Sequence, residues 1–283
     1  MKIFFTFSVV AAFMATLSAV DTHTLEPSVI HGPKTVGGPG RPAARIVGGV
    51  NAATGQFPFV TAITMDDSFF CTSSLLSHNW ILTAAHCAVE ASTFGVKLGI
   101  TNFLGDEDGV VTTKSRKVVV NPNYNTVNSS FDIALIMLAS PVTYTSRIQP
   151  VKLPSRSSAS SSLAGTAVRE MGWGISDDFP TTVSPVLNYV DMHVISNEEC
   201  SKSFPGFIDS TIICAIGANM KGACGGDSGG PLVTDYDSSA PVLVGVADFV
   251  GYQGCWGGEP TGFARVSYHL DWIHSATGIA VRS

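Results

Sequence analysis

The chain has 283 residues, of which 45% are hydrophobic and 13% are charged, and this composition excludes an intrinsically disordered protein. The formal net charge is −6 without a long run of either sign, which disfavours partners such as nucleic acid or an anionic membrane surface. We therefore expect a soluble protein with one large or two small globular units.

The N-terminal segment has the layout of a secretory signal peptide. Lys2 precedes an apolar stretch, residues 3–20, that ends in small residues near Ala19. The alternative is a membrane anchor, but this stretch contains several hydroxyl residues and is barely long enough to span a bilayer. The sequence therefore predicts a signal peptide at residues 1–19, a secreted, extracellular protein and no membrane association.

The rest of the chain divides into a leader and a β-rich region. Residues 20–45 are rich in Pro and Gly and have no apolar period, which predicts a flexible leader. From Ile46 onward, short runs rich in Val, Ile, Thr and Phe are separated by turn residues, and this pattern is typical of all-β proteins. Strands are predicted at 59–65, 117–120 and 242–246.

Two segments depart from the strand pattern. The serine-rich segment 155–162 predicts an exposed loop. At the C-terminus, Ser267 is expected to cap a short helix whose apolar residues are Leu270, Trp272 and Ile273. No other helix is predicted.

Three short motifs carry the chemistry. The segment 226–231 reads GDSGGP, and a Ser among glycines can occupy a tight turn whose backbone N–H groups face a substrate carbonyl. Alone, it could be an ordinary Gly-rich loop. That alternative loses its weight because TAAHC at 83–87 and DIAL at 132–135 lie upstream, so that His, Asp and Ser follow in an order known for one class of catalytic triad.

These motifs resemble those of the chymotrypsin family, and the resemblance extends from Ile46 to the C-terminus. It includes IVGG at 46–49, WIL at 80–82, GWG at 172–174, FARV at 263–266 and WI at 272–273. Within that family the chain looks most like arthropod chymotrypsins, elastases and collagenolytic serine proteases. The resemblance implies an all-β fold of two six-stranded antiparallel β-barrels with the active site between them, a short C-terminal helix and a peptidase domain at 46–283.

The resemblance also implies a role for each residue of the triad. Ser228 would attack the peptide carbonyl, His86 would take its proton and pass it to the leaving amine, and Asp132 would orient the imidazole. The backbone N–H groups of Gly226 and Ser228 would form the oxyanion hole. The implied activity is that of a serine endopeptidase that works through an acyl-enzyme and requires no metal or other cofactor.

Six cysteines lie beyond the predicted signal peptide, and an even number in a secreted chain predicts disulfides. A zinc site is not expected, because no two cysteines have the short separation that such sites use. Spacing alone leaves the pairing open. The resemblance implies the pairs Cys71–Cys87, Cys200–Cys214 and Cys224–Cys255.

The specificity pocket is inferred from the resemblance. Its floor would be Gly222, where trypsin-like enzymes carry Asp, so a basic P1 side chain would lose hydration without finding an anion. Val250 and Thr261 match wall positions that are open glycines in chymotrypsin-like pockets, which favours Ala, Val or Leu. Gly225 and the likeness to collagenolytic enzymes favour a wider range. An apolar P1 residue is expected, and its size stays open because the register of the loop 251–254 is not fixed.

The bond between Arg45 and Ile46 is the predicted activation site. The resemblance implies that cleavage lets the new amino group of Ile46 pair with the buried Asp227, which makes residues 20–45 an activation propeptide. Because Gly222 would reject basic side chains, a separate trypsin-like protease is expected to cut after Arg45. The other expected partners are protein or peptide substrates and protein protease inhibitors, and the enzyme is expected to be a monomer.

Two other classes of function are compatible with this family. A catalytically dead homologue that serves as a binding module is disfavoured, because all three triad residues are present. A cascade protease of immunity or clotting is disfavoured because no disulfide-rich accessory domain precedes Ile46. A digestive or otherwise broadly acting enzyme is therefore favoured, and the sequence does not identify its physiological substrate.

Three features leave alternatives open. The acidic run 106–108 fits a solvated turn better than a calcium site, and Asn128 is a formal glycosylation acceptor near the triad. Asp248 stands where relatives usually have a Ser that donates to the catalytic Asp. It would turn outward without effect, or point inward. An inward carboxyl would either be protonated and donate to Asp132, or be ionised, favour the charged imidazole of His86 and move the acid limb of the pH profile upward.

Overall fold

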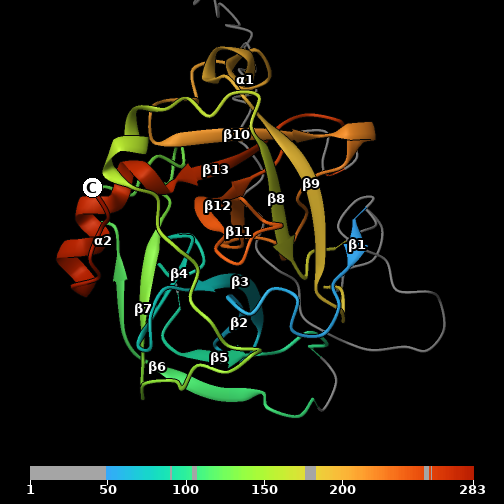
Figure 1. The fold of residues 1–283 in the computed structure, drawn as a ribbon. Coiled ribbons are helices and arrows are strands. Elements are labelled where there is room, and N and C mark those ends of the chain that lie inside the picture. Colours follow the sequence, from blue (N-terminus) through green and yellow to red (C-terminus); the bar gives the residue numbers. More distant parts are fainter. Residues whose placement is uncertain (1–48, 90, 104–106, 176–182, 252–254, 256) are drawn as a thin grey trace, which may run out of the picture.

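The computed structural model describes residues 49–89, 91–103, 107–175, 183–251, 255 and 257–283. Its first β-barrel occupies the lower half of Figure 1, in cyan and green. Its strands are β2 (Val60–Met65), β3 (Phe69–Leu75), β4 (Trp80–Thr83), β5 (Phe94–Leu98), β6 (Val111–Val120) and β7 (Ala134–Leu138). They pair in the closed order β2-β3-β4-β7-β6-β5, and every pairing is antiparallel.

The second barrel lies above the first in Figure 1. Its strands are β8 (Ala167–Gly172), β9 (Asn188–Ile195), β10 (Ile212–Gly217), β11 (Pro231–Thr234), β12 (Val242–Phe249) and β13 (Thr261–Arg265). They follow the order β9-β10-β13-β12-β11-β8, and an additional pairing of β8 with β9 closes the ring. The short β1 (Val50–Asn51) extends the sheet beside β9.

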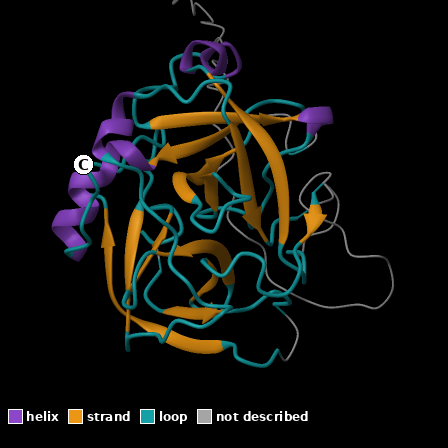
Figure 2. Ribbon diagram, viewed as in Figure 1, coloured by secondary structure: helices purple, strands orange, loops and turns teal. Residues whose placement is uncertain are grey.

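The two six-stranded antiparallel barrels confirm the predicted fold, and Figure 2 shows how few helices accompany the strands. The three strands predicted from the Val/Ile-rich runs fall on β2, β6 and β12. Among the described residues, no helix has the length and apolar character that a membrane crossing requires.

Burial explains why these segments form barrel strands. In β9, Val190, Met192 and Val194 are buried while Asp191 and His193 between them are exposed, which is the alternation of a strand with one face toward a core. By contrast, every residue of β4 is buried, because this strand is covered on both faces. Each fully buried Leu or Ile contributes about 1.5 to 3 kcal/mol to stability.

The helices differ from the sequence prediction at several points. The C-terminal helix α2 (Leu270–Thr277) is present, but Ser267 does not cap it. The preceding residues already form the 3₁₀-helix η3 (Val266–His269), so the chain enters α2 from a helical turn and its capping residue is His269. The predicted serine-rich loop contains a further 3₁₀-helix, η1 (Arg156–Ser160), capped by the Ser155 side chain.

The helix α1 (Asn197–Ser203) was not predicted. Its capping residue is Ser196, whose Oγ accepts a hydrogen bond from the N–H of Glu199. A Ser followed three residues later by Glu is a known helix-start pattern, so the signal was present in the sequence. A last short 3₁₀-helix, η2 (Ala218–Met220), follows β10.

Candidate active site

His86 and Asp132 come from two loops of the first barrel. His86 follows β4 and Asp132 precedes β7, and these strands pair in register, which brings the loops together. The backbone N–H of His86 donates to Oδ1 of Asp132 at 2.8 Å, and Nδ1 of His86 lies 2.5 Å from Oδ2. Asp132 is fully buried and His86 is 9% exposed. One carboxylate thus holds both the ring and the backbone of the histidine.

Asp132 is arranged to carry a negative charge. Burial acts to raise its pKa, but the charge of His86 and the hydrogen bonds from His86 and Asp248 outweigh burial and hold the pKa of Asp132 below its usual value. An ionised Asp132 accepts the Nδ1 proton, so the neutral imidazole has an unprotonated Nε2. That atom is buried and has no hydrogen-bond partner in the described part of the chain. It is therefore available as a proton acceptor.

Ser228 lies on the loop before β11 in the second barrel, and β3 of the first barrel holds this loop. The N–H of Thr72 donates to the carbonyl of Ser228 at 2.9 Å, and Oγ1 of Thr72 donates to the carbonyl of Gly226 at 3.0 Å. Gly229 has a φ of +78°, and a Cβ there would lie 2.0 Å from Oγ1 of Thr83. Only Gly allows this close approach, which places Ser228 at the junction of the barrels.

Asp227 organises the same loop from inside. Its Oδ1 accepts from the N–H of Gly174 at 2.7 Å and its Oδ2 from the N–H of Cys224 at 2.9 Å. Asp227 is fully buried, and burial raises its pKa to about 7 in spite of these two hydrogen bonds. The described residues supply no salt-bridge partner for it. The predicted activation residues, Arg45 and Ile46, lie outside the described residues.

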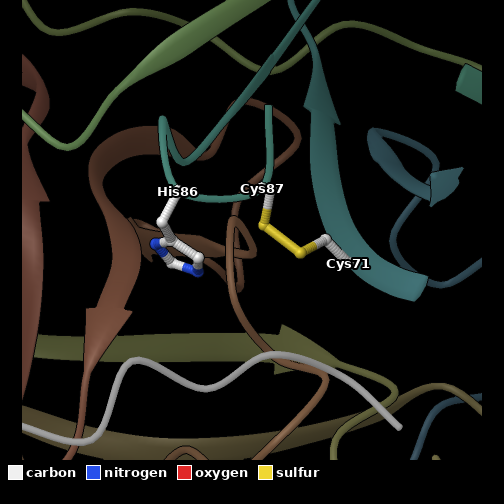
Figure 3. Close-up of side chains that lie close together, drawn as sticks. All are labelled: Cys71, His86 and Cys87. Atoms are coloured by element: carbon white, nitrogen blue, oxygen red, sulfur yellow. A yellow bond between two sulfur atoms is a disulfide. The ribbon is translucent and has the colours of Figure 1, made fainter. Parts of the chain in front are cut away.

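Three disulfides tie the loops together. They are the pairs that the resemblance implies: Cys71–Cys87, Cys200–Cys214 and Cys224–Cys255. The first of these joins β3 to the residue after His86, and Figure 3 shows the imidazole pointing away from this bridge. The bridge therefore anchors the histidine loop, and one ring nitrogen of His86 lies within 4.8 Å of both sulfur atoms.

A small cavity of about 10 Å³ lies beside Ser228. The predicted wall residues Val250 and Thr261 both line it, together with Asp248. Gly222, the predicted floor, does not line this cavity but lies behind Thr261, since a Cβ on Gly222 would be 3.2 Å from Oγ1 of Thr261. The cavity beside the serine is thus narrowed by two branched side chains.

Asp248 points inward, so the outward alternative is wrong. The β12–β13 register shifts between Ala247 and Phe249, so Asp248 is the unpaired residue of a β-bulge, a feature that re-aims side chains. It is 4% exposed and is hydrogen-bonded to Asp132 and Ser129. Burial, and then the charge of Asp132, raise the pKa of Asp248 well above its usual value.

Four other histidines lie among the described residues, and their surroundings are those of packed or surface side chains. His78 stacks on Tyr144 at a centroid distance of 3.8 Å, and His193 and His274 are exposed. His269 is buried, and burial lowers its pKa to about 4.

Two of the open sequence features have local structural roles. Glu107 of the acidic run accepts hydrogen bonds from the backbone N–H groups of Thr101 and Asn102 and pairs with Arg147. Its carboxylate is therefore engaged by protein donors, while Asp106 lies outside the described residues. The Asn128 side chain accepts a hydrogen bond from the N–H of Ser130, which closes a turn, and its glycosylation stays a prediction.

Glu170 was missed by the sequence analysis. It lies on β8, is fully buried, and neither of its carboxyl oxygens has a hydrogen-bond partner among the described residues. Burial, and then the charge of Asp227, raise the pKa of Glu170 well above its usual value. A glutamate at an inward position of a strand was the signal that could have found it.

Comparisons with known proteins support this reading of the fold and motifs. The family described as Trypsin matches residues 46–273. The chain belongs to the trypsin family. Brachyurin from Leptuca pugilator is 42% identical over 83% of this chain and 99% of its own length. Collagenase from Hypoderma lineatum is 36% identical over 83% of this chain and 88% of its own length.

A solved structure described as HL collagenase has the same fold. It is 35% identical, with a TM-score of 0.75, and the match covers 83% of this chain and 100% of that one. The likeness to arthropod collagenolytic serine proteases inferred from the motifs is thereby confirmed. The trypsin-family chain is a chymotrypsin-like serine endopeptidase.

Proposed function

We propose that this endopeptidase is secreted as a precursor and, once processed, cleaves after apolar residues with His86, Asp132 and Ser228 as its triad. The observation that carries the triad is the orientation of the imidazole. Its Nδ1 lies 2.5 Å from the carboxylate of Asp132, and its Nε2 has no partner among the described residues. The base is thus oriented by one nitrogen and left available at the other.

The proposed reaction follows from these positions. The hydroxyl oxygen of Ser228 attacks the peptide carbonyl while its proton passes to Nε2 of His86. The tetrahedral intermediate collapses, the C–N bond breaks, and the proton moves from Nε2 to the leaving amine. Water then repeats the sequence on the acyl-enzyme and frees Ser228. Asp132 remains ionised throughout and stabilises the imidazolium that forms twice in each cycle.

Backbone geometry supports Gly226 and Ser228 as the oxyanion hole. In a planar trans peptide the N–H and the C=O point in opposite directions. The carbonyl of Gly225 accepts a backbone hydrogen bond at 2.5 Å, and the carbonyl of Asp227 accepts one from Gly230 at 2.8 Å. With both carbonyls directed into the protein, the N–H groups of Gly226 and Ser228 are directed the other way, where they can bind a developing oxyanion.

The small cavity supports an apolar P1 preference. The side chains of Val250 and Thr261 fill part of the cavity. Among the described residues that line it, Asp248 is the one ionisable side chain, and it is expected to be neutral. A Lys or Arg side chain would therefore be desolvated there without a counter-charge. We propose that small and medium side chains such as Ala, Val and Leu are preferred over Phe and Tyr.

The carboxylate of Asp227 has no salt-bridge partner among the described residues, and this supports activation by cleavage. A fully buried acid whose pKa is raised to about 7 is poorly matched to its surroundings at neutral pH, and the ammonium of a new Ile46 N-terminus would neutralise it. We propose that a trypsin-like protease cuts after Arg45 and that residues 1–19 and 20–45 are the signal peptide and the propeptide. The disulfides and the two collagenolytic relatives support an extracellular, digestive role.

The remaining partners follow from this role. Protein or peptide substrates and protein protease inhibitors would bind the processed monomer at the cleft between the barrels, and no cofactor is required for the reaction.

Ser228→Ala tests the proposed activity. The processed variant is expected to lose roughly 10⁴-fold or more in kcat on peptide substrates, because the acyl-enzyme no longer forms. A mixed peptide library with varied P1 residues, given to the unmodified enzyme, then measures specificity. Retained activity in the variant would refute the triad, and a preference for Lys or Arg would refute the pocket assignment.

A further inference from the structure

Asp248 and Asp132 form a buried pair of carboxyl groups beside the imidazole of His86. One ring nitrogen of His86 and one carboxyl oxygen from each aspartate all lie within 4.8 Å of one another. Asp132 is fully buried and Asp248 is 4% exposed. Two ionised carboxylates at this distance in a buried site repel each other strongly, so a shared proton between them is the favourable arrangement.

The donors around the pair decide which carboxyl keeps the proton. Asp132 accepts from the backbone N–H of His86 at 2.8 Å and faces Nδ1 at 2.5 Å. Besides its hydrogen bond with Asp132, Asp248 has one donor among the described residues, the hydroxyl of Ser129, and its Oδ2 is buried without a partner there. The negative charge is therefore better stabilised on Asp132, and the proton belongs on Asp248.

The other titratable group near the pair does not alter this assignment. His269 on η3 interacts electrostatically with Asp132 and with Asp209, but burial lowers its pKa to about 4, so it is neutral above that pH. Asp209 itself is held by the hydroxyl groups of Ser130 and Thr211. Within the part of the chain that the structure describes, His86 is thus the one group that faces the pair as a cation during turnover.

We propose that Asp248 is a positioning residue that remains protonated and donates a hydrogen bond to Asp132, so that the imidazole of His86 meets one negative charge and not two. The inference rests on the proposed triad. The proton stays on Asp248 through the cycle, while the proton from Ser228 travels through His86 to the leaving amine. Asp248 fixes the orientation of Asp132, and Asp132 fixes that of the ring.

This arrangement predicts a distinct response to pH. When alkali removes the proton from Asp248, the hydrogen bond to Asp132 is replaced by repulsion between two buried charges. The orientation of the imidazole is then lost, and kcat is expected to fall in an alkaline limb that belongs to this pair. At neutral pH and below, Asp248 contributes no charge, so it is expected to leave the acid limb of the profile in place.

Asp248→Asn and Asp248→Ala separate these contributions. Asn keeps a neutral donor and cannot ionise, so the alkaline limb of kcat due to the pair is expected to disappear while the acid limb of kcat/KM stays where it is. Ala removes the donor, and kcat is expected to fall roughly 10- to 100-fold below that of the Asn variant, as for one hydrogen bond to a charged group. Thermal unfolding of both variants shows whether either has failed to fold.

Infrared difference spectroscopy detects the proton directly and does not depend on activity. The spectrum of the unmodified enzyme minus that of Asp248→Asn at neutral pH is expected to contain the C=O band of a protonated carboxylic acid. Asp191→Asn, at an exposed carboxylate, is the control and should show only an ionised carboxylate. This measurement stays informative if the proposed triad fails in the Ser228→Ala test.

Two results would overturn the proposal. One is a difference spectrum that shows an ionised Asp248. The other is an acid limb that moves down by roughly 1 to 3 pH units in Asp248→Asn, which is the effect of removing a negative charge near the imidazole.

Discussion

Two buried pairs of carboxyl groups lie in the described part of this protein, and their surroundings differ. Asp248 is hydrogen-bonded to Asp132, and Asp132 also binds Nδ1 of the His86 imidazole. Asp227 has two backbone donors but no salt bridge among the described residues, and Glu170 beside it has no hydrogen-bond partner there. The described residues thus supply a hydrogen-bonded base to the first pair, but they supply no cation to the second.

This difference indicates how one fold supports both catalysis and control. A buried charge whose partners come from neighbouring strands and loops forms its contacts as soon as the barrels fold. A buried charge whose partner is absent weakens the loop around it until a partner arrives. The second pair lies directly behind Ser228, so its state is expected to determine whether the oxyanion loop is ordered.

The largest effect on activity is expected from a precursor in which no cation can reach Asp227 in the second pair. In an Arg45→Ala precursor the bond before Ile46 stays intact, so no new ammonium reaches Asp227. Activity is expected to be roughly 100- to 5,000-fold below that of the processed enzyme, as for a buried ion pair with one partner missing, about 3 to 5 kcal/mol.

Peptide hydrolysis before and after treatment with trypsin measures this effect, with the unmodified precursor as the control. Unmodified precursor incubated alone should not acquire Ile46 as a new N-terminus, because its own pocket rejects Arg45. Full activity from the intact Arg45→Ala chain would show that Asp227 needs no cation.

The second pair should also make the uncut chain lose stability as pH rises. The pKa of Asp227 is about 7 when folded and 3.8 ordinarily, so the folded state binds its proton more tightly. The stabilisation is therefore complete below about pH 4 and is lost as pH rises to about 7. At 1.36 kcal/mol per unit, the loss is at most about 4 kcal/mol.

Urea unfolding of a chain that carries both Arg45→Ala and Ser228→Ala, across this pH range, measures the loss. Adding Asp227→Asn should flatten the pH dependence, and adding Glu170→Gln should reduce it, because each removes one acid of the second pair. An identical pH slope with and without Asp227→Asn would contradict the assignment.

A smaller effect, on P1 specificity, is expected from substitutions in the wall of the cavity beside the first pair. Thr261→Gly removes a branched wall residue and is expected to raise kcat/KM for Phe over Ala at P1 by roughly 10- to 200-fold, the range for a change in pocket size. Val250→Gly is the matched variant on the opposite wall segment. Unchanged P1 ratios in both variants would show that this cavity does not set specificity.

Motifs and periodicity predicted those features of the fold and the site that short segments of sequence determine. The barrels, the order of His86, Asp132 and Ser228 and the disulfide pairs followed from short segments and a family resemblance. The inward turn of Asp248 did not, because it depends on a shift in the β12–β13 register that only the folded sheet reveals. Glu170 was missed for a related reason. The rise in its pKa comes from burial and then from the charge of Asp227, and both depend on the folded barrel.

The most direct test of the first pair is the tautomer of His86. With ¹⁵N-labelled imidazole, NMR at neutral pH distinguishes a protonated Nδ1 from a protonated Nε2. If Asp132 is ionised and the proton of the carboxyl pair lies on Asp248, Nδ1 of the neutral ring is protonated and Nε2 is not. A neutral ring protonated on Nε2 would contradict the account, because that nitrogen could not accept the proton of Ser228.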